Sequence, residues 1–243
     1  MRVLAVVHQP DTAAELFEDV VRAHGHEFEE WSIPEQPAPS RDHDAVMIFG
    51  GSANVDQESK HPWLRDEDEF IRGLLADGVP TLGVCLGGQL LAKAAGAHVG
   101  PSPEPEFGFV RTWLTDGAAD DPLFGSLPRE FDVFEAHGYA FHVPEGAIEL
   151  ARSRVCSQAF RLGRSAWGLQ FHPEIRAAQV ARWLRGDRLP NADALIAELD
   201  ARYDEWAAFG ERLCAAFLQS AATTAASARS DGRAETSSSH AAT

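Results

Sequence analysis

The sequence has 243 residues, of which 44% are hydrophobic and 24% are charged, a composition typical of a globular domain with one sizeable core. Its formal net charge is −16, from 37 acidic and 21 basic residues, and such a charge repels nucleic-acid phosphates and anionic membranes. An apolar run of about 18 residues, which a membrane-spanning helix needs, is missing. We therefore expect no nucleic-acid partner and no membrane partner.

Short apolar runs alternate with helical patterns, which predicts an α/β fold: a three-layer, mostly parallel sheet with flanking helices. In chain order we expect a strand at 2–7, a helix at 12–24, a strand at 28–31, a proline-rich loop at 32–40, a strand at 45–49, a helix at 63–76, a strand at 79–84 and a helix at 89–95. Strands at 107–114, 131–136, 147–151, 156–162 and 166–171 follow, and helices at 176–185 and 192–218 close the fold.

The composition of the two ends of the sequence and the spacing of its cysteines give expectations about domain limits, cellular compartment and disulfide or metal sites. We expect one domain over residues 1–220 and a disordered tail at 221–243, because the Ala-, Ser- and Thr-rich tail cannot bury a core. The first apolar run is too short for a signal peptide, so a cytoplasmic protein is expected. Cys85, Cys156 and Cys214 lack C-x-x-C spacing, so we expect neither a disulfide framework nor a metal site. No cofactor is expected either.

Cys85 lies in the segment Gly83-Val84-Cys85-Leu86-Gly87-Gly88, between an expected strand and an expected helix. This is the G-x-nucleophile-x-G arrangement with cysteine in place of serine. The nucleophile of such a turn has a strained backbone, and larger side chains two positions away would collide. The turn presents the sulfur at the carboxyl edge of the sheet, and the following helix N-terminus favours the reactive thiolate. A buried structural thiol and a redox-sensing cysteine are the alternatives that this motif leaves open.

His172 and Glu174 supply the base and the orienting group that a cysteine nucleophile needs. An apolar strand leads to His172, and Pro173 forces a turn just after it. Glu174 follows two residues on, close enough to accept a hydrogen bond from the imidazole and to stabilise the imidazolium. A cysteine that only senses oxidants has no need of this pair. We therefore predict a catalytic triad of Cys85, His172 and Glu174.

Taken together, the motifs resemble those of the class I, triad-type glutamine amidotransferases. The matching segments are Phe49-Gly50-Gly51-Ser52, Gly83-Val84-Cys85-Leu86-Gly87-Gly88-Gln89 and Gln170-Phe171-His172-Pro173-Glu174, with weaker similarity in Glu106-Phe107-Gly108-Phe109, Asp121-Pro122-Leu123-Phe124, His137-Gly138 and Gln158-Ala159-Phe160. They follow the order of the family over roughly residues 1–220. The resemblance implies a stand-alone enzyme that hydrolyses the glutamine side-chain amide through a γ-glutamyl thioester on Cys85.

The resemblance also implies roles around the triad. By the family pattern, the backbone N–H groups of Gly51 and Leu86 form the oxyanion hole. Gly50, which precedes Gly51, is expected to bind the substrate. Gln89 matches a family position that helps to bind glutamine. Gly138 and Tyr139 match the segment whose backbone binds the amino-acid end of the substrate.

Departures from the family pattern leave the substrate open. Tyr139 replaces a frequent Asp, Ala136 replaces Trp, Ser or Asn, and Ser52 replaces a frequent Pro. The alternative is therefore a γ-glutamyl hydrolase or peptidase that acts on γ-glutamyl amines or peptides with the same triad. A non-catalytic binding or redox protein is a third hypothesis. An amidotransferase would need a separate synthase or ligase subunit as ammonia acceptor, because no phosphate-binding P-loop motif is present.

Overall fold

A single mixed sheet forms the centre of the molecule in the computed structural model, which describes residues 1–9, 12–33, 35–186 and 191–238. Within these residues the sheet has nine strands in the order β2-β1-β3-β4-β9-β8-β7-β5-β6. The strands are β1 (Arg2–Val7), β2 (Glu27–Ser32), β3 (Ala45–Ile48), β4 (Thr81–Val84), β5 (Val99–Leu114), β6 (Glu130–Phe141), β7 (Ile148–Arg152), β8 (Ser157–Leu162) and β9 (Ala166–Leu169). The α/β fold predicted from the sequence is confirmed.

The parallel half of the sheet consists of β2, β1, β3, β4 and β9. Strands β3, β4 and β9 are buried along their whole length, as expected when both faces of a sheet are covered. Successive side chains of β1 therefore enter two different cores: Val3 and Val7 pack on one side, Leu4 and Val6 on the other. This alternation explains why the strand sequence is continuously apolar.

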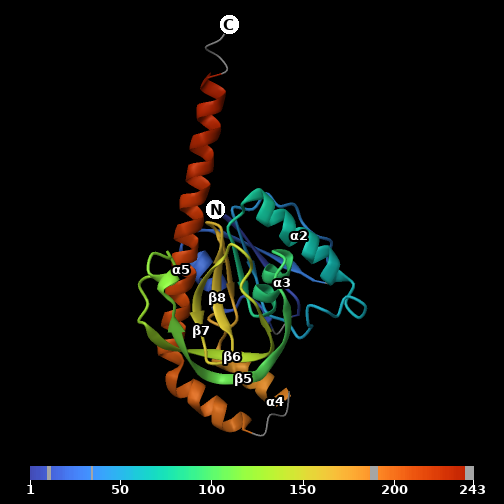
Figure 1. Cartoon of the computed structure of the whole chain (residues 1–243), viewed down its shortest axis with the longest axis vertical. Helices are drawn as coiled ribbons and strands as arrows, with labels where there is room; N and C mark the ends of the chain where they lie inside the picture. Colours follow the sequence, from blue (N-terminus) through green and yellow to red (C-terminus); the bar gives the residue numbers. More distant parts are fainter. Residues whose placement is uncertain (10–11, 34, 187–190, 239–243) are drawn as a thin grey trace.

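Helices cover both faces and complete the three layers. They are α1 (Leu16–Ala23), α2 (Trp63–Asp77), α3 (Leu86–Ala94), α4 (Ala177–Gly186) and α5 (Ala192–Ser238), with a short 3₁₀ turn at Asp116–Ala118. One core holds apolar side chains of α1 and α5, and the other holds those of α2 and α3. Figure 1 shows α5 along one side of the sheet and α2 with α3 on the opposite side.

The antiparallel half consists of β8, β7, β5 and β6, and one of its strands begins earlier than predicted. Strand β5 begins at Val99, eight residues before the expected start at 107. Prolines at 101, 103 and 105 hide this part of the strand from a sequence reading, because proline cannot donate to a ladder and is avoided in regular strands. Accordingly, the β5–β6 register shifts between Pro101 and Glu106.

The final helix is longer than predicted. Helix α5 continues to Ser238, through most of the segment for which we expected disorder, and Figure 1 shows it extending beyond the rest of the molecule. Alanine has the highest helix propensity of all residues, so this segment can continue a helix that packing has already nucleated. Residues 239–243, the end of the expected tail, lie outside the described residues. Within the described residues no helix combines the length and apolar character needed to cross a membrane.

Gly210 allows α5 to lie against the segment that carries His172. A Cβ atom at this buried position would collide with the backbone carbonyl oxygen of Pro173. We predict that Gly210→Ala lowers the free energy of unfolding by about 2 kcal/mol. Helix propensity alone predicts the opposite sign, a gain of about 1 kcal/mol. Urea unfolding measures the difference.

Gly138→Ala is the matched control, because a Cβ atom at this position would meet no other group within 4 Å. Stabilisation of the protein by Gly210→Ala would contradict the tight contact between α5 and Pro173.

Candidate active site

Cys85 occupies the sharp turn between β4 and α3. Its backbone has φ 52° and ψ −110°, a region that residues other than glycine rarely adopt. The turn is held at both ends: the Cys85 N–H donates to the carbonyl of Leu169 at 2.8 Å, and the Gln89 N–H donates to the carbonyl of Cys85 at 2.9 Å. The strained nucleophile turn expected from the sequence is therefore present.

Glycines around Cys85 are needed because backbones approach closely there. A Cβ atom at Gly83 would collide with the backbone of Gly87, and one at Gly87 would collide with the carbonyl oxygen of Ile48. The turn that carries Cys85, called the elbow below, thus packs directly on the neighbouring strand β3. Only glycine leaves room for this approach.

His172 follows β9, the strand that pairs with β4. Its N–H donates to the carbonyl of Phe134 at 3.0 Å, and its ring makes an edge-on contact with Trp183, with ring centroids 5.3 Å apart. The side chains of Cys85 and His172 are neighbours, because a Cβ atom at Gly50 would lie within 4 Å of both. On the far side of the ring, Nδ1 of His172 lies 2.9 Å from Oε1 of Glu174. The structure therefore brings the three predicted triad residues together.

The electrostatics of the site favour a charged imidazole. Burial opposes the charge on His172, but the Cys85 sulfur and the Glu174 carboxylate, with their hydrogen bonds, raise the pKa of His172 well above its usual value. Both partners contact the ring directly, so the imidazolium form is stabilised from two sides. A histidine in this state can donate a proton to a leaving group.

A pocket of about 260 Å³ opens over Cys85. Its lining residues are Gln9, Thr12, Gly51, Ser52, Cys85, Phe107, Ala136, His172, Arg182, Trp183 and Leu184. Phe107 is 40% exposed, which is uncommon for a phenylalanine, and it forms an apolar wall together with Trp183. The pocket is thus polar near Gln9 and Ser52, and on the side of α4 and β5 it combines apolar side chains with the charged Arg182.

Gly50 and Gly51 lie against side chains of the predicted triad and of α3. A Cβ atom at Gly50 would lie 3.1 Å from Cε1 of His172 and 3.8 Å from Cβ of Cys85. Gly51 lines the pocket, and a Cβ atom there would lie 2.8 Å from the side chain of Leu86. Leu86 is the first residue of α3, where backbone N–H groups have no partner within the helix. Both proposed oxyanion donors therefore flank Cys85.

A buried ion pair holds the Gly50–Gly51 peptide. Nδ1 of His8 donates to the carbonyl of Gly50 at 2.9 Å, and Nε2 lies 3.0 Å from Oε1 of Glu67. Burial lowers the pKa of His8, but Glu67 and the backbone carbonyls outweigh it and raise that pKa above its usual value. Because a trans peptide is planar, fixing the Gly50 carbonyl also fixes the direction of the Gly51 N–H.

The remaining predicted binding residues lie beside the pocket and not among its lining residues. Gln89 is buried, and its side-chain amide donates to the backbone carbonyl of Tyr139 at 2.9 Å. The hydroxyl of Tyr139 donates to Asp56 at 3.3 Å, and Gly138 is exposed. In this structure Gln89 therefore supports the Gly138–Tyr139 segment instead of facing the Cys85 pocket.

Sequence reasoning missed several residues of the site. Arg182 and Trp183 come from α4, and no sequence pattern indicates that this helix covers the mouth of the pocket. The His8–Glu67 pair joins residues 59 positions apart. The position of His8 just after the first strand places it at the edge of the sheet, but nothing in the sequence indicates Glu67 as its partner.

The sequence profile described as "Glutamine amidotransferase class-I" matches residues 12–184. The chain belongs to this family. Among solved structures, a glutamine amidotransferase from Methylobacillus flagellatus superposes with a TM-score of 0.82 at 28% identity, covering 90% of this chain and 94% of that one. The fold and the family are thus shown by two independent comparisons.

Two curated relatives of the amidotransferase domain have different names. The chain is 33% identical over 147 residues to a glutamine-hydrolyzing GMP synthase of Thermomicrobium roseum, over 60% of this chain and 25% of the synthase. It is also 33% identical over 170 residues to a gamma-glutamyl-L-1-hydroxyisopropylamide hydrolase of a Pseudomonas species, over 64% of this chain and 57% of the hydrolase. The chain therefore spans less than two thirds of either relative.

We predict that Glu174→Gln lowers the pKa of His172, because the substitution removes a negative charge beside Nδ1. Loss of a carboxylate that favours the imidazolium moves the deprotonation of His172 to lower pH. NMR titration of labelled histidine measures the shift.

For the same variant we also expect the rate of amide hydrolysis to fall roughly 10²-fold. Glu145→Gln, at an exposed site, is the control, and equal titration of His172 in the two variants would contradict the proposed role of Glu174.

We predict that His8→Gln lowers kcat at least about tenfold with little change in KM, because it releases the peptide that carries the Gly51 N–H. Steady-state kinetics of amide hydrolysis separate the two parameters. The matched control is His43→Gln: His43 is also buried and pairs with Glu29 at 2.9 Å, but it lies outside the pocket lining. Equal losses of kcat in both variants would exclude a specific role for His8.

Proposed function

We propose that this amidotransferase hydrolyses the side-chain amide of glutamine through a γ-glutamyl thioester on Cys85 and releases ammonia for an acceptor enzyme. The observation that carries the proposal is that Cys85 and His172 line one pocket while Glu174 is hydrogen-bonded to the imidazole of His172. A strained nucleophile, a base and an orienting carboxylate are the parts that acyl transfer by cysteine needs. Membership of the family supports the same chemistry.

In the first half-reaction the sulfur of Cys85 attacks the γ-carboxamide carbon and forms an S–C bond. The carbonyl electrons move onto oxygen, where the N–H groups of Gly51 and Leu86 would stabilise the oxyanion. Each such donor contributes about 2.7–4 kcal/mol to transition-state stabilisation. As the intermediate collapses, the C–N bond breaks and the imidazolium of His172 donates its proton to the departing ammonia.

The second half-reaction regenerates the enzyme. His172, now neutral, removes a proton from a water molecule, which attacks the thioester carbon. The S–C bond breaks, glutamate leaves, and sulfur and imidazolium re-form their pair. Glu174 keeps the ring in the required orientation throughout. No step needs a cofactor.

The amino-acid end of the substrate would bind towards Gly138 and Tyr139. The bond from Gln89 to the Tyr139 carbonyl supports this assignment, because it fixes the backbone of that segment. Gln89 would then act by positioning the segment. An acceptor synthase or ligase on a separate subunit is the partner that this proposal requires, and a cytoplasmic location stays a prediction from the sequence.

The second candidate is hydrolysis of γ-glutamyl amines. It is favoured by the apolar wall of the pocket, where Phe107, Trp183 and Leu184 could contact an alkyl substituent that glutamine lacks. Ala136 also lines the pocket, and its small side chain leaves space at this wall. The name of the Pseudomonas relative describes an amide of this class. The reaction would be the same, with an alkylamine leaving in place of ammonia.

The two candidates are distinguished by incubating purified protein with glutamine and, separately, with a γ-glutamyl alkylamide, and by measuring the products of each reaction. We predict glutamate and ammonia in equal amounts from glutamine, and loss of at least about 10³-fold of this rate in Cys85→Ser, because the hydroxyl is far less nucleophilic. Turnover of the alkylamide with none of glutamine would establish the second candidate. Absence of turnover of both substrates would contradict cysteine-dependent amide hydrolysis.

A further inference from the structure

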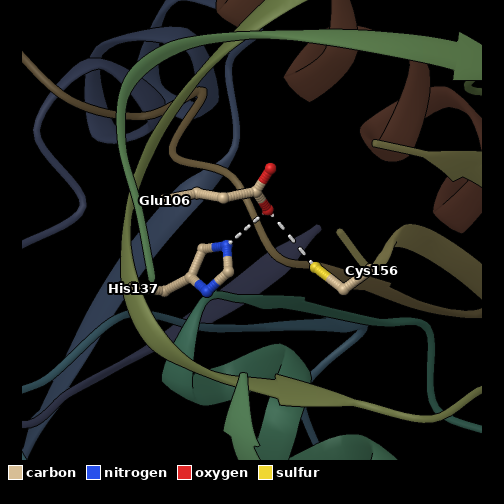
Figure 2. Close-up of side chains that lie close together, drawn as sticks. All are labelled: Glu106, His137 and Cys156. Carbon is tan, nitrogen blue, oxygen red and sulfur yellow. Dashed lines mark hydrogen bonds and ion pairs between the residues drawn. The ribbon is translucent and has the colours of Figure 1, made fainter. Parts of the chain in front are cut away.

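A second cluster of polar side chains is enclosed by the antiparallel half of the sheet. Oε2 of Glu106 lies 3.1 Å from Nε2 of His137 and 3.4 Å from Sγ of Cys156. The three ligand atoms lie within 4.8 Å of one another. Figure 2 shows the imidazole and the thiol approaching the same carboxylate oxygen from two sides.

The fold fixes this arrangement. Glu106 on β5 and His137 on β6 are direct cross-strand partners, so their side chains share one face of the sheet. Cys156 lies in the turn between β7 and β8, where the hydroxyl of Ser153 accepts from the backbone N–H groups of residues 155 and 156. Three separate segments thus converge on one point.

A second carboxyl group lies beside the imidazole of His137. Glu135 is fully buried, and its Oε2 lies 3.3 Å from Nε2 of His137. Neither oxygen of Glu135 accepts a hydrogen bond in the described part of the chain. A buried carboxylate without such bonds is costly. The cluster therefore collects two carboxyl groups and a thiol around one imidazole, and because burial raises the pKa of Glu135 and of Cys156, a cation that binds the thiol must displace its proton.

The cluster is within reach of solvent. A cavity of about 550 Å³, larger than the pocket over Cys85, is lined by Ser153 and Cys156. Cys156 is itself only half-buried. An ion entering this cavity would therefore meet the thiol first and the carboxylate of Glu106 behind it.

We propose that Glu106, His137 and Cys156 form a binding site for a divalent transition metal, best suited to Zn²⁺. Zinc binds oxygen, nitrogen and sulfur at about 2.0–2.3 Å in a tetrahedron, so neighbouring ligand atoms lie about 3.3–3.6 Å apart. The distances of 3.1 and 3.4 Å from the Glu106 carboxylate to the other two ligand atoms are close to that spacing. A set of thiolate, imidazole and carboxylate ligands also selects zinc over magnesium or calcium.

Binding exchanges protons for the metal. The thiol of Cys156 releases its proton to solvent as the bond to the ion forms, whereas His137 would bind through Nε2 as the neutral imidazole with its proton on Nδ1. Gln158, whose amide donates to Oε2 of Glu106 at 3.0 Å, would remain bonded to that carboxylate and orient it. No sequence pattern indicated this site, because Glu106 and Cys156 are 50 positions apart and the ligands follow no spacing motif.

The triad is a competing site, since Cys85, His172 and Glu174 are also a thiol, an imidazole and a carboxylate. The test therefore uses the full chain with Cys85→Ala, which removes the active-site thiol. Titration with Co²⁺ under reducing conditions gives a thiolate-to-cobalt charge-transfer band when a cysteine is a ligand. We predict saturation of this band at one equivalent of metal, and displacement of the Co²⁺ by Zn²⁺.

Cys156→Ser in the same background is expected to abolish the band, and its hydroxyl keeps the polar contact with Glu106. Glu106→Gln is expected to weaken Co²⁺ binding at least about tenfold. The matched control is Cys214→Ala, because Cys214 is buried in α5 away from the cluster, and this variant should keep the band. Circular dichroism verifies that each variant is folded.

A folded Cys85→Ala protein without a charge-transfer band would overturn the proposal, as would a band that persists after Cys156→Ser. Both results are independent of glutamine hydrolysis, so the metal site and the proposed activity can fail separately.

Discussion

The parallel pairing of β4 with β9 is the constraint on which the active site depends. Val84 and Leu169 are partners at the ends of these strands, so Cys85 and His172 leave the sheet at the same edge. The N–H of Cys85 donates to the carbonyl of Leu169, which joins the elbow directly to the strand that leads to the base. The sulfur and the imidazole therefore meet because of backbone pairing, and their own attraction only completes the contact.

Two further contacts convert this adjacency into a reactive site. The backbone strain at Cys85 is sustained by close packing of the glycines on β3, which leaves the sulfur no alternative direction. The ion pair of His8 and Glu67 holds the Gly50 carbonyl beneath the pocket. Both are buried, which suits the proposed stabilisation of an oxyanion, because preorganised groups need no rearrangement during the reaction. Stability of the core and preorganisation of the site thus come from the same residues.

The sequence predicted the parts of the site that depend on local patterns. Continuous apolar strands and the glycine spacing around Cys85 located the elbow, and His172 was placed because a strand end and a proline mark its position. It did not predict that Gln89 contacts the Tyr139 carbonyl or that Trp183 lines the pocket, because the direction of a helical side chain and the helix that lies against a pocket are decided by tertiary packing. The helix beyond residue 221 escaped prediction for a related reason: alanine-rich composition fits both a disordered tail and a helix extended from a packed core.

The most direct test of the central claim is the alkylation rate of Cys85 by iodoacetamide at about pH 7, compared with that of a free cysteine peptide. If the sulfur and imidazole act as a pair, Cys85 in the native protein reacts much faster than the peptide, and His172→Ala removes the advantage while the fold is retained. Alkylation of Cys85 at the rate of a free thiol, unchanged by loss of His172, would contradict the account.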